Sequence, residues 1–228
     1  MSNLRILIVL TSHDQLGDTG QATGFWLEEL ANPYYIFLDA DAAVTLASIQ
    51  GGRAPLDPKS HLDESQTDDT KRFLADSAAQ DRLANTIAID QVNADDYDAI
   101  FLPGGHGTMW DFATSSTLRN LIEAFDQKEK IIAAVCHAPA GLVTVKTASG
   151  EPLVKDKVVT AFTNSEEKAV ELDTVVPFLL ETRLRELGAK FESGPDWGPL
   201  AKQDGNLITG QNPASSGAAA KAVLAALV

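Results

Sequence analysis

The sequence has little cysteine, little positive charge and no long hydrophobic run. Its one cysteine among 228 residues, Cys136, rules out a disulfide within the chain and is compatible with a reducing compartment. The formal net charge is −14, which argues against nucleic acid as a partner because an acidic surface repels phosphate backbones. No stretch approaches the roughly 20 apolar residues of a membrane helix, and the N-terminus lacks the pattern of a secretory signal. We therefore expect a cytoplasmic protein without nucleic-acid or membrane partners.

The remaining composition is that of a globular enzyme or binding domain, with 44% hydrophobic residues. Short apolar or β-rich runs predict strands within residues 5–12, 98–105, 130–137, 157–163 and 206–213. Helical patterns lie within residues 23–30, 68–86, 116–128, 174–188 and 213–228. Strands that alternate with helices predict an α/β fold, with a mostly parallel sheet covered by helices on both faces.

We expect one domain over residues 1–228, because the sequence shows neither an internal repeat nor a low-complexity linker. Residues 51–69 form a turn-rich insertion in this pattern. Such an insertion is either a plain surface loop or a border of the functional site, since long ordered loops in compact domains are often functional.

The stretch IIAAVCHAPAGL, residues 131–142, places Cys136 where a buried strand ends and a helical turn begins. Ala134 and Ala138 lie two residues to either side, as the small residues of a nucleophile elbow do. A helix N-terminus at this point favours a thiolate, and the backbone N–H of His137 points toward an oxyanion formed at the sulfur. The alternative is an inert buried cysteine, but the elbow spacing and the adjacent histidine favour a nucleophile.

The stretch FLPGGHG, residues 101–107, ends another predicted strand in a glycine-rich turn. Gly105 has no side chain, so its N–H can approach a reacting atom and supply a second oxyanion donor. The alternative is a tight turn alone. We expect His106 to line the pocket or to be structural rather than to act as a base.

Six stretches together resemble the ThiJ/PfpI superfamily, which has the class I glutamine amidotransferase-like fold. They are TGFWLEELANPY, LASIQGGRAPLDP, FLPGGHGTMWD, AAVCHAPAGL, VVTAFTNSEE and LITGQNPAS, and they occur in the family's order over nearly the whole chain. The branch that they resemble most is the heat-shock-chaperone and glyoxalase III group. The resemblance implies a flavodoxin-like three-layer sandwich, a homodimer and a nucleophilic cysteine.

The resemblance also implies roles for individual residues. Cys136 is the nucleophile, His137 its neighbouring histidine, Glu29 the N-terminal glutamate and Gly105 an oxyanion-hole residue. The triad acid falls in FTNSEE, at Glu167 with Glu166 as the competitor. A carboxyl group beside a thiol in a half-buried site should have a raised pKa and share its proton with the sulfur. Trp26, Trp110 and Trp197 lie in or beside these motifs and are weaker candidates for the pocket lining. Large aromatic residues more often belong to the hydrophobic core. The zinc ligands of some longer members have no counterpart, so no metal is expected.

The leading functional hypothesis is a glutathione-independent glyoxalase that converts methylglyoxal or a similar 2-oxoaldehyde to a 2-hydroxy acid without a cofactor. One alternative is a stress-response chaperone that holds unfolded proteins, which would need an exposed apolar patch. Another is a redox sensor that oxidises Cys136. A cysteine peptidase or amidase ranks lower, because a histidine adjacent to the cysteine is constrained as a base.

Overall fold

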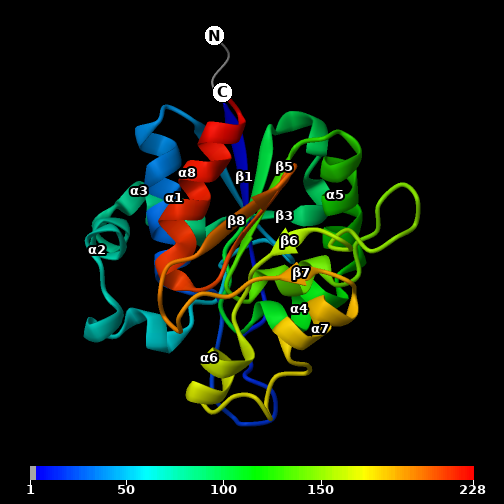
Figure 1. Ribbon diagram of the computed structural model, residues 1–228. Helices are drawn as coiled ribbons and strands as arrows, with labels where there is room; N and C mark the ends of the chain where they lie inside the picture. Colours follow the sequence, from blue (N-terminus) through cyan, green and yellow to red (C-terminus); the bar gives the residue numbers. More distant parts are fainter. Residues whose placement is uncertain (1–3) are drawn as a thin grey trace.

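The structure is a computed structural model that describes residues 4–228. Seven of its strands form one sheet in the order β3-β2-β1-β4-β5-β9-β8, and β6 and β7 form a second, two-stranded sheet (Figure 1). The strands are β1 (Arg5–Leu10), β2 (Ala43–Ser48), β3 (Ile87–Ala88), β4 (Ala99–Leu102), β5 (Ile131–Val135), β6 (Val158–Val159), β7 (Lys190–Phe191), β8 (Ala201–Asp204) and β9 (Leu207–Gly210).

All strand pairs of the large sheet are parallel except β8 with β9 at one edge. Both faces are buried, because Leu7 and Val9 of β1 belong to one core cluster while Ile6 and Ile8 belong to the other. The mostly parallel α/β sandwich expected from the sequence is thereby confirmed.

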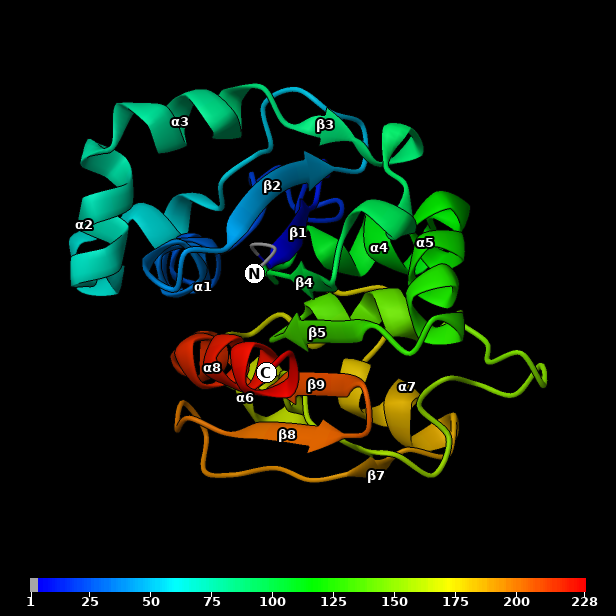
Figure 2. The ribbon, with the colours of Figure 1, turned by 90° about the horizontal axis from the view of Figure 1, so that it is seen from above.

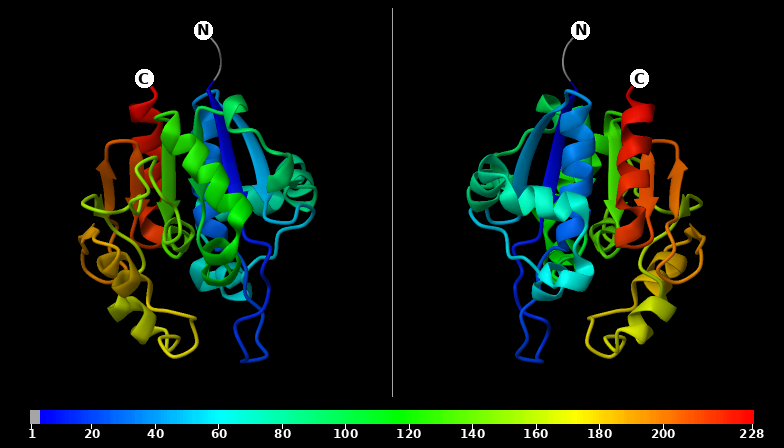
Figure 3. Two further views of the ribbon diagram at one scale, coloured as in Figure 1. Left: turned by 90° about the vertical axis from the view of Figure 1, so that its right-hand side faces the viewer. Right: turned by 90° about the vertical axis from the view of Figure 1, so that its left-hand side faces the viewer.

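Helices lie on both faces of this sheet and beyond the carboxyl ends of its strands (Figure 2 and Figure 3). They are α1 (Leu27–Asp39), α2 (Asp68–Ala75), α3 (Ser77–Ala84), α4 (Thr108–Thr114), α5 (Ser116–Gln127), α6 (Asn164–Ala169), α7 (Leu180–Glu186) and α8 (Ser216–Ala226). Viewed from above, α1 and α8 lie side by side on one face and α4 and α5 on the other (Figure 2). Among the described residues, no helix combines the length and the apolar character that a bilayer crossing requires.

Several helix boundaries differ from the sequence-based prediction. The helix expected at 23–30 begins at Leu27 and continues to Asp39. The helix expected at 68–86 is two helices, because Asp76 is extended and its carboxylate caps α3 by accepting N–H bonds from Ala78 and Ala79. The helix expected from residue 174 begins only at Leu180, after Pro177.

The structure also places the run at 157–163, which differs from expectation, and the turn-rich insertion at 51–69. The run at 157–163 contributes only β6 to a separate sheet with β7, and then turns to approach the end of β5. The insertion at 51–69 contains two short 3-10 turns, at Pro58–His61 and Asp63–Ser65, and it lies against residues 23–25, where Phe25 N–H donates to Pro55 and Asp57 N–H donates to Phe25. This insertion therefore supports the approach to α1.

The carboxyl ends of the parallel strands meet at one end of the molecule, where parallel sheets place their ligands. The hairpin at 12–22 and the segment that contains α6 both extend from this end, one from each side of the sheet (Figure 3). Cys136 follows β5 directly at the same end.

Candidate active site

Cys136 lies on a sharp, strained turn between β5 and a 3-10 helix at 138–142. Its φ is +59°, in the left-handed region that non-glycine residues rarely adopt. The turn is held on both sides, because Cys136 N–H donates to Gly210 at 2.8 Å and Cys136 C=O accepts from Phe162 N–H at 2.9 Å. A strained conformation that the surrounding chain fixes in this way is typical of a functional site.

Glu29 is a fully buried carboxyl group in the first turn of α1. Its Oε2 accepts an N–H bond from Gly104 at 2.7 Å, whereas its buried Oε1 has no hydrogen-bond partner among residues 4–228. Burial raises the pKa of Glu29 to about 8, although the Gly104 N–H and the neighbouring Cys136 thiol act in the opposite direction. A buried carboxyl oxygen without a partner beside a thiol is well placed to exchange a proton with a bound molecule.

Burial also raises the pKa of the Cys136 thiol well above its ordinary value, and the charge of Glu29 adds to the effect. The sequence-based expectation of a thiolate favoured by a helix N-terminus therefore differs from the structure. The physical reason is that only a short 3-10 turn follows Cys136, while the thiol itself is 3% exposed. Attack by this sulfur then requires a base, and His137 Nδ1 lies 3.3 Å from Sγ.

Glu167 contacts two histidine rings at once. Its Oε2 lies 2.7 Å from His137 Nε2 and its Oε1 lies 2.7 Å from His106 Nε2. Burial alone would raise the pKa of Glu167, but the two histidines together hold it well below its usual range. Burial lowers the pKa of His137, which favours the neutral ring. A neutral ring that donates Nε2–H to an ionised Glu167 leaves Nδ1 free to accept the thiol proton.

Glu166, the competing triad acid, faces away from the histidines. Its carboxylate accepts bonds from the N–H of Trp197 at 2.9 Å and of Thr163 at 3.0 Å, and from the side chain of Asn212 at 2.9 Å. The capping box that Thr163 and Glu166 form starts α6 and turns Glu167 toward the rings. The structure therefore distinguishes the two glutamates, because Glu167 contacts the histidines and Glu166 does not. The sequence alone did not reveal this difference, since the two residues are adjacent.

Two residues that line the same cavity as Cys136 have backbone N–H groups with no acceptor among the described residues. Within the described chain, neither Gly105 N–H nor His137 N–H donates to another protein atom. The φ of Gly105 is +107°, and a Cβ at this residue would lie 2.6 Å from the Trp26 nitrogen, so only glycine fits. That these two N–H groups form an oxyanion hole stays a prediction, which their lack of a protein acceptor among the described residues permits.

The thiol opens into a small cavity of about 140 Å³. The cavity is lined by Trp26, Gly105, His106, Cys136, His137, Phe162, Val170, Trp197 and Pro213. His106 and Trp26, two of the candidates from sequence, are among these residues. Trp110 is not, because its ring stacks on His13 at 5.1 Å and borders a different cavity.

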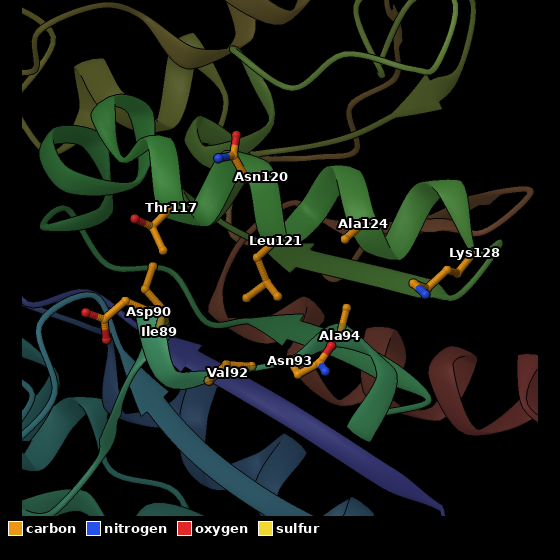
Figure 4. Close-up of a pocket in the computed structure, with 10 residues that line it drawn as sticks. All are labelled: Ile89, Asp90, Val92, Asn93, Ala94, Thr117, Asn120, Leu121, Ala124 and Lys128. Carbon is orange, nitrogen blue, oxygen red and sulfur yellow. The ribbon is translucent and has the colours of Figure 1, made fainter.

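Another hollow, of about 350 Å³, lies between α5 and the segment 89–94 (Figure 4). Its side chains include Ile89, Leu121 and Lys128, and neither cysteine nor histidine lines it. Because this lining lacks a cysteine with a neighbouring histidine, the smaller cavity at Cys136 is the better candidate for catalysis.

The donor atoms of His106, His137 and Glu167 lie within 4.8 Å of one another, close enough to hold a metal ion. The 2.7 Å contacts of both histidines with the carboxylate account for the same arrangement through hydrogen bonds. The second contact, from His106, was not foreseen from sequence, since GGHG alone gives no indication of which side chain its histidine meets.

Comparison with known proteins shows similarity over nearly the whole chain. The model of the DJ-1/PfpI family matches residues 21–226. A relative named glutathione-independent glyoxalase HSP31, from Saccharomyces cerevisiae, is 32% identical, with 95% of this chain and 94% of the relative covered. Glyoxalase 3 from Candida albicans is 26% identical, with 98% of each chain covered.

Solved structures agree with these matches. Rapid Encystment Protein 24 KDa from Francisella tularensis is 41% identical, with a TM-score of 0.94 and 99% of each chain covered. The structure of glyoxalase III from Candida albicans is 26% identical, with a TM-score of 0.91, and covers 98% of this chain and 97% of its own.

Proposed function

The chain belongs to the DJ-1/PfpI family, and on that basis we propose that it is a glutathione-independent glyoxalase that converts methylglyoxal or a related 2-oxoaldehyde to a 2-hydroxy acid. One observation supports this reaction above all. Glu29, whose pKa burial raises to about 8, lies close enough to Cys136 for each group to shift the pKa of the other, and its Oε1 has no hydrogen-bond partner among the described residues. A nucleophile beside a carboxyl group poised near neutral pH is what an internal proton shift between two carbon atoms requires.

The first step forms a bond between the sulfur and the aldehyde carbon, C1. His137 Nδ1 takes the thiol proton, Sγ attacks C1, and the electron pair of the carbonyl moves to its oxygen, O1. The N–H groups of Gly105 and His137 stabilise this oxyanion until O1 receives the proton from His137, which completes a hemithioacetal. Glu167 keeps the His137 ring in the tautomer that this transfer needs.

The second step is an isomerisation. The ionised carboxylate of Glu29 removes the hydrogen of C1 and returns it to C2, while the hydroxyl proton passes from O1 to the oxygen on C2. The product is the thioester of a 2-hydroxy acid, with no net change in protons or electrons. Water then adds to C1, the S–C1 bond breaks, and the thiol regains its proton. The sum is a 2-oxoaldehyde plus water giving a 2-hydroxy acid, and this balance calls for no cofactor.

Lactate formation from methylglyoxal in the absence of glutathione tests the proposal. We expect turnover by the purified protein, its loss in Cys136→Ala, and a loss of at least about 100-fold in Glu29→Gln, because general-base catalysis contributes about that much. Glu28→Gln is the matched control, since Glu28 is the next residue on α1 but bonds to Thr67. Turnover that persists without the Cys136 thiol, or that is equally reduced in the control, would contradict these assignments.

The domain organisation, oligomeric state and location of the protein are further proposals that fit the same family resemblance. We propose that it acts as a single domain, because both core clusters pack on the one sheet. We further propose a cytoplasmic homodimer with a small aldehyde as its substrate. Sedimentation at equilibrium should then give about twice the chain mass of 24.3 kDa.

A further inference from the structure

Glu166 is a buried carboxylate that the proposed mechanism does not use. Its Oε1 accepts three hydrogen bonds, from Trp197 N–H at 2.9 Å, Asn212 Nδ2 at 2.9 Å and Gln211 Nε2 at 3.2 Å. Its Oε2 accepts two more from Thr163, through the backbone N–H at 3.0 Å and the hydroxyl at 3.1 Å. Five donors on one fully buried side chain are more than a capping box needs, so Glu166 must fix something further.

One segment that Glu166 fixes is the loop that carries Trp197. The backbone of Trp197 has a φ of +63°, which is unfavourable for a tryptophan and persists only where neighbouring contacts impose it. The bond from its N–H to Glu166 is such a contact. The ring lies edge-on to Phe162, with centroids 5.8 Å apart, and the residue is 50% exposed. An exposed tryptophan held in a strained conformation above the nucleophile indicates a function rather than core packing.

Trp197 forms an outer wall of the Cys136 cavity. Its other apolar lining residues are Trp26, Phe162, Val170 and Pro213, and the two histidines and Cys136 also line it. The volume of about 140 Å³ is well below the 300–1,000 Å³ of pockets for drug-sized ligands, so the cavity suits a small molecule. Once S–C1 is formed, the substituent on C2 is the part of a 2-oxoaldehyde that remains to contact these walls.

We propose that Trp197 is a specificity-determining residue that selects 2-oxoaldehydes with an apolar substituent on C2, and that Glu166 is the residue that positions it. This inference rests on the proposed glyoxalase reaction for its substrate class. A hydroxylated substituent would exchange the hydration of its hydroxyl group for contact with the apolar ring faces of Trp197 and Phe162. Burying an unpaired hydroxyl is unfavourable, and sites select against it by roughly 10- to 100-fold.

A pair of substrates of equal size tests the selection. 2-Oxobutanal carries an ethyl group where 3-hydroxy-2-oxopropanal carries a hydroxymethyl group. We expect the wild-type kcat/KM to favour the ethyl compound by at least about tenfold, and Trp197→Gly to reduce this ratio to about two. Glycine suits the positive φ of this residue, so the variant should fold. Trp197→Phe should keep most of the ratio, and Trp110→Ala, which removes a tryptophan outside the cavity, should keep all of it.

Alkylation of Cys136 separates this inference from the proposed function, because it needs no turnover. N-propyl-iodoacetamide and N-(2-hydroxyethyl)-iodoacetamide differ only by a terminal methyl or hydroxyl group. Wild type should react faster with the propyl reagent, and Trp197→Gly should lose the preference. A preference that depends on Trp197 in a protein without glyoxalase turnover would overturn the proposed function alone. Equal rates in wild type, or a ratio unchanged in Trp197→Gly, would overturn the inference while turnover stands.

Glu166→Gln tests the positioning role. Either orientation of the glutamine amide points its NH2 group at hydrogen-bond donors, because both carboxylate oxygens of Glu166 accept. We expect the Trp197 loop to be released, with stronger quenching of tryptophan fluorescence by acrylamide and a selectivity ratio that falls to that of Trp197→Gly. Trp197 itself is still present in this variant. A Glu166→Gln protein with the wild-type ratio and quenching would show that Glu166 does not position the ring.

Discussion

Glu29 determines how the proposed reaction responds to pH. Burial raises its pKa to about 8, and the carboxylate removes a hydrogen from C1 only when it is ionised. We therefore expect kcat/KM for methylglyoxal to rise with pH through an apparent pKa near 8, by roughly fivefold between pH 7 and pH 8. The measurement is a rate profile from pH 6 to pH 9.5. A profile that is flat across this range, as a carboxyl group with the ordinary pKa of 4.5 would give, would show that Glu29 is not the proton acceptor.

His106 affects the reaction through its hydrogen bond to Glu167. Removing that donor leaves Oε1 of a buried carboxylate without a partner, which is unfavourable by about 1–3 kcal/mol. His106→Leu should then lower kcat/KM by roughly 10- to 100-fold, whereas His106→Gln, which can still donate, should keep more of the activity. Steady-state kinetics of both variants measure the difference. Equal losses in the two would indicate that the imidazole itself, rather than its N–H, is required.

At the scale of elements, the short helix α6 carries Glu167, the proposed triad acid. Thr163 caps it, so Thr163→Ala should destabilise the protein by about 1 kcal/mol and should also lower kcat/KM, because Glu167 depends on that turn. Asp76→Ala is the matched control, since it removes a comparable cap from α3, far from the thiol. Urea unfolding measures the change in stability of each variant, and steady-state kinetics measure the change in kcat/KM. If both variants lose activity equally, the loss reflects stability rather than the position of Glu167.

The elements also show where sequence patterns work. Apolar runs predicted β1, β4, β5 and β9, because strands buried on both faces leave a continuous apolar signal. The pattern failed where local signals were weak. The break at Asp76 is a cap inside a continuous helical pattern. The strand β6 lies within the run predicted at 157–163, but it pairs with the unpredicted β7 instead of joining the large sheet, which periodicity does not reveal.

For the whole molecule, the buried Glu29 makes stability depend on pH. Its folded-state pKa of about 8 lies above the ordinary 4.5, so the folded protein keeps a proton that the unfolded chain releases between these values. The free energy of unfolding should therefore fall as pH rises from about 4.5 to about 8. Each tenfold change in the ionisation constant corresponds to about 1.4 kcal/mol, which gives a loss of several kcal/mol. Urea unfolding of wild type at pH 5 and pH 8 should show this loss, and Glu29→Gln should show much less. A loss of equal size in Glu29→Gln would assign the effect to other groups.

The sequence by itself determined the α/β fold, the elbow at Cys136 and the family, because these depend on local spacing and on motifs in order along the chain. Only the tertiary structure decided which glutamate serves His137, because Glu166 and Glu167 differ in direction and not in sequence context. It also decided that His106 shares that carboxylate and that Trp197, not Trp110, borders the thiol. These facts depend on residues from β4, β5, α1, α6 and the loop before β8, which approach one another only when the parallel strands bring their carboxyl ends together.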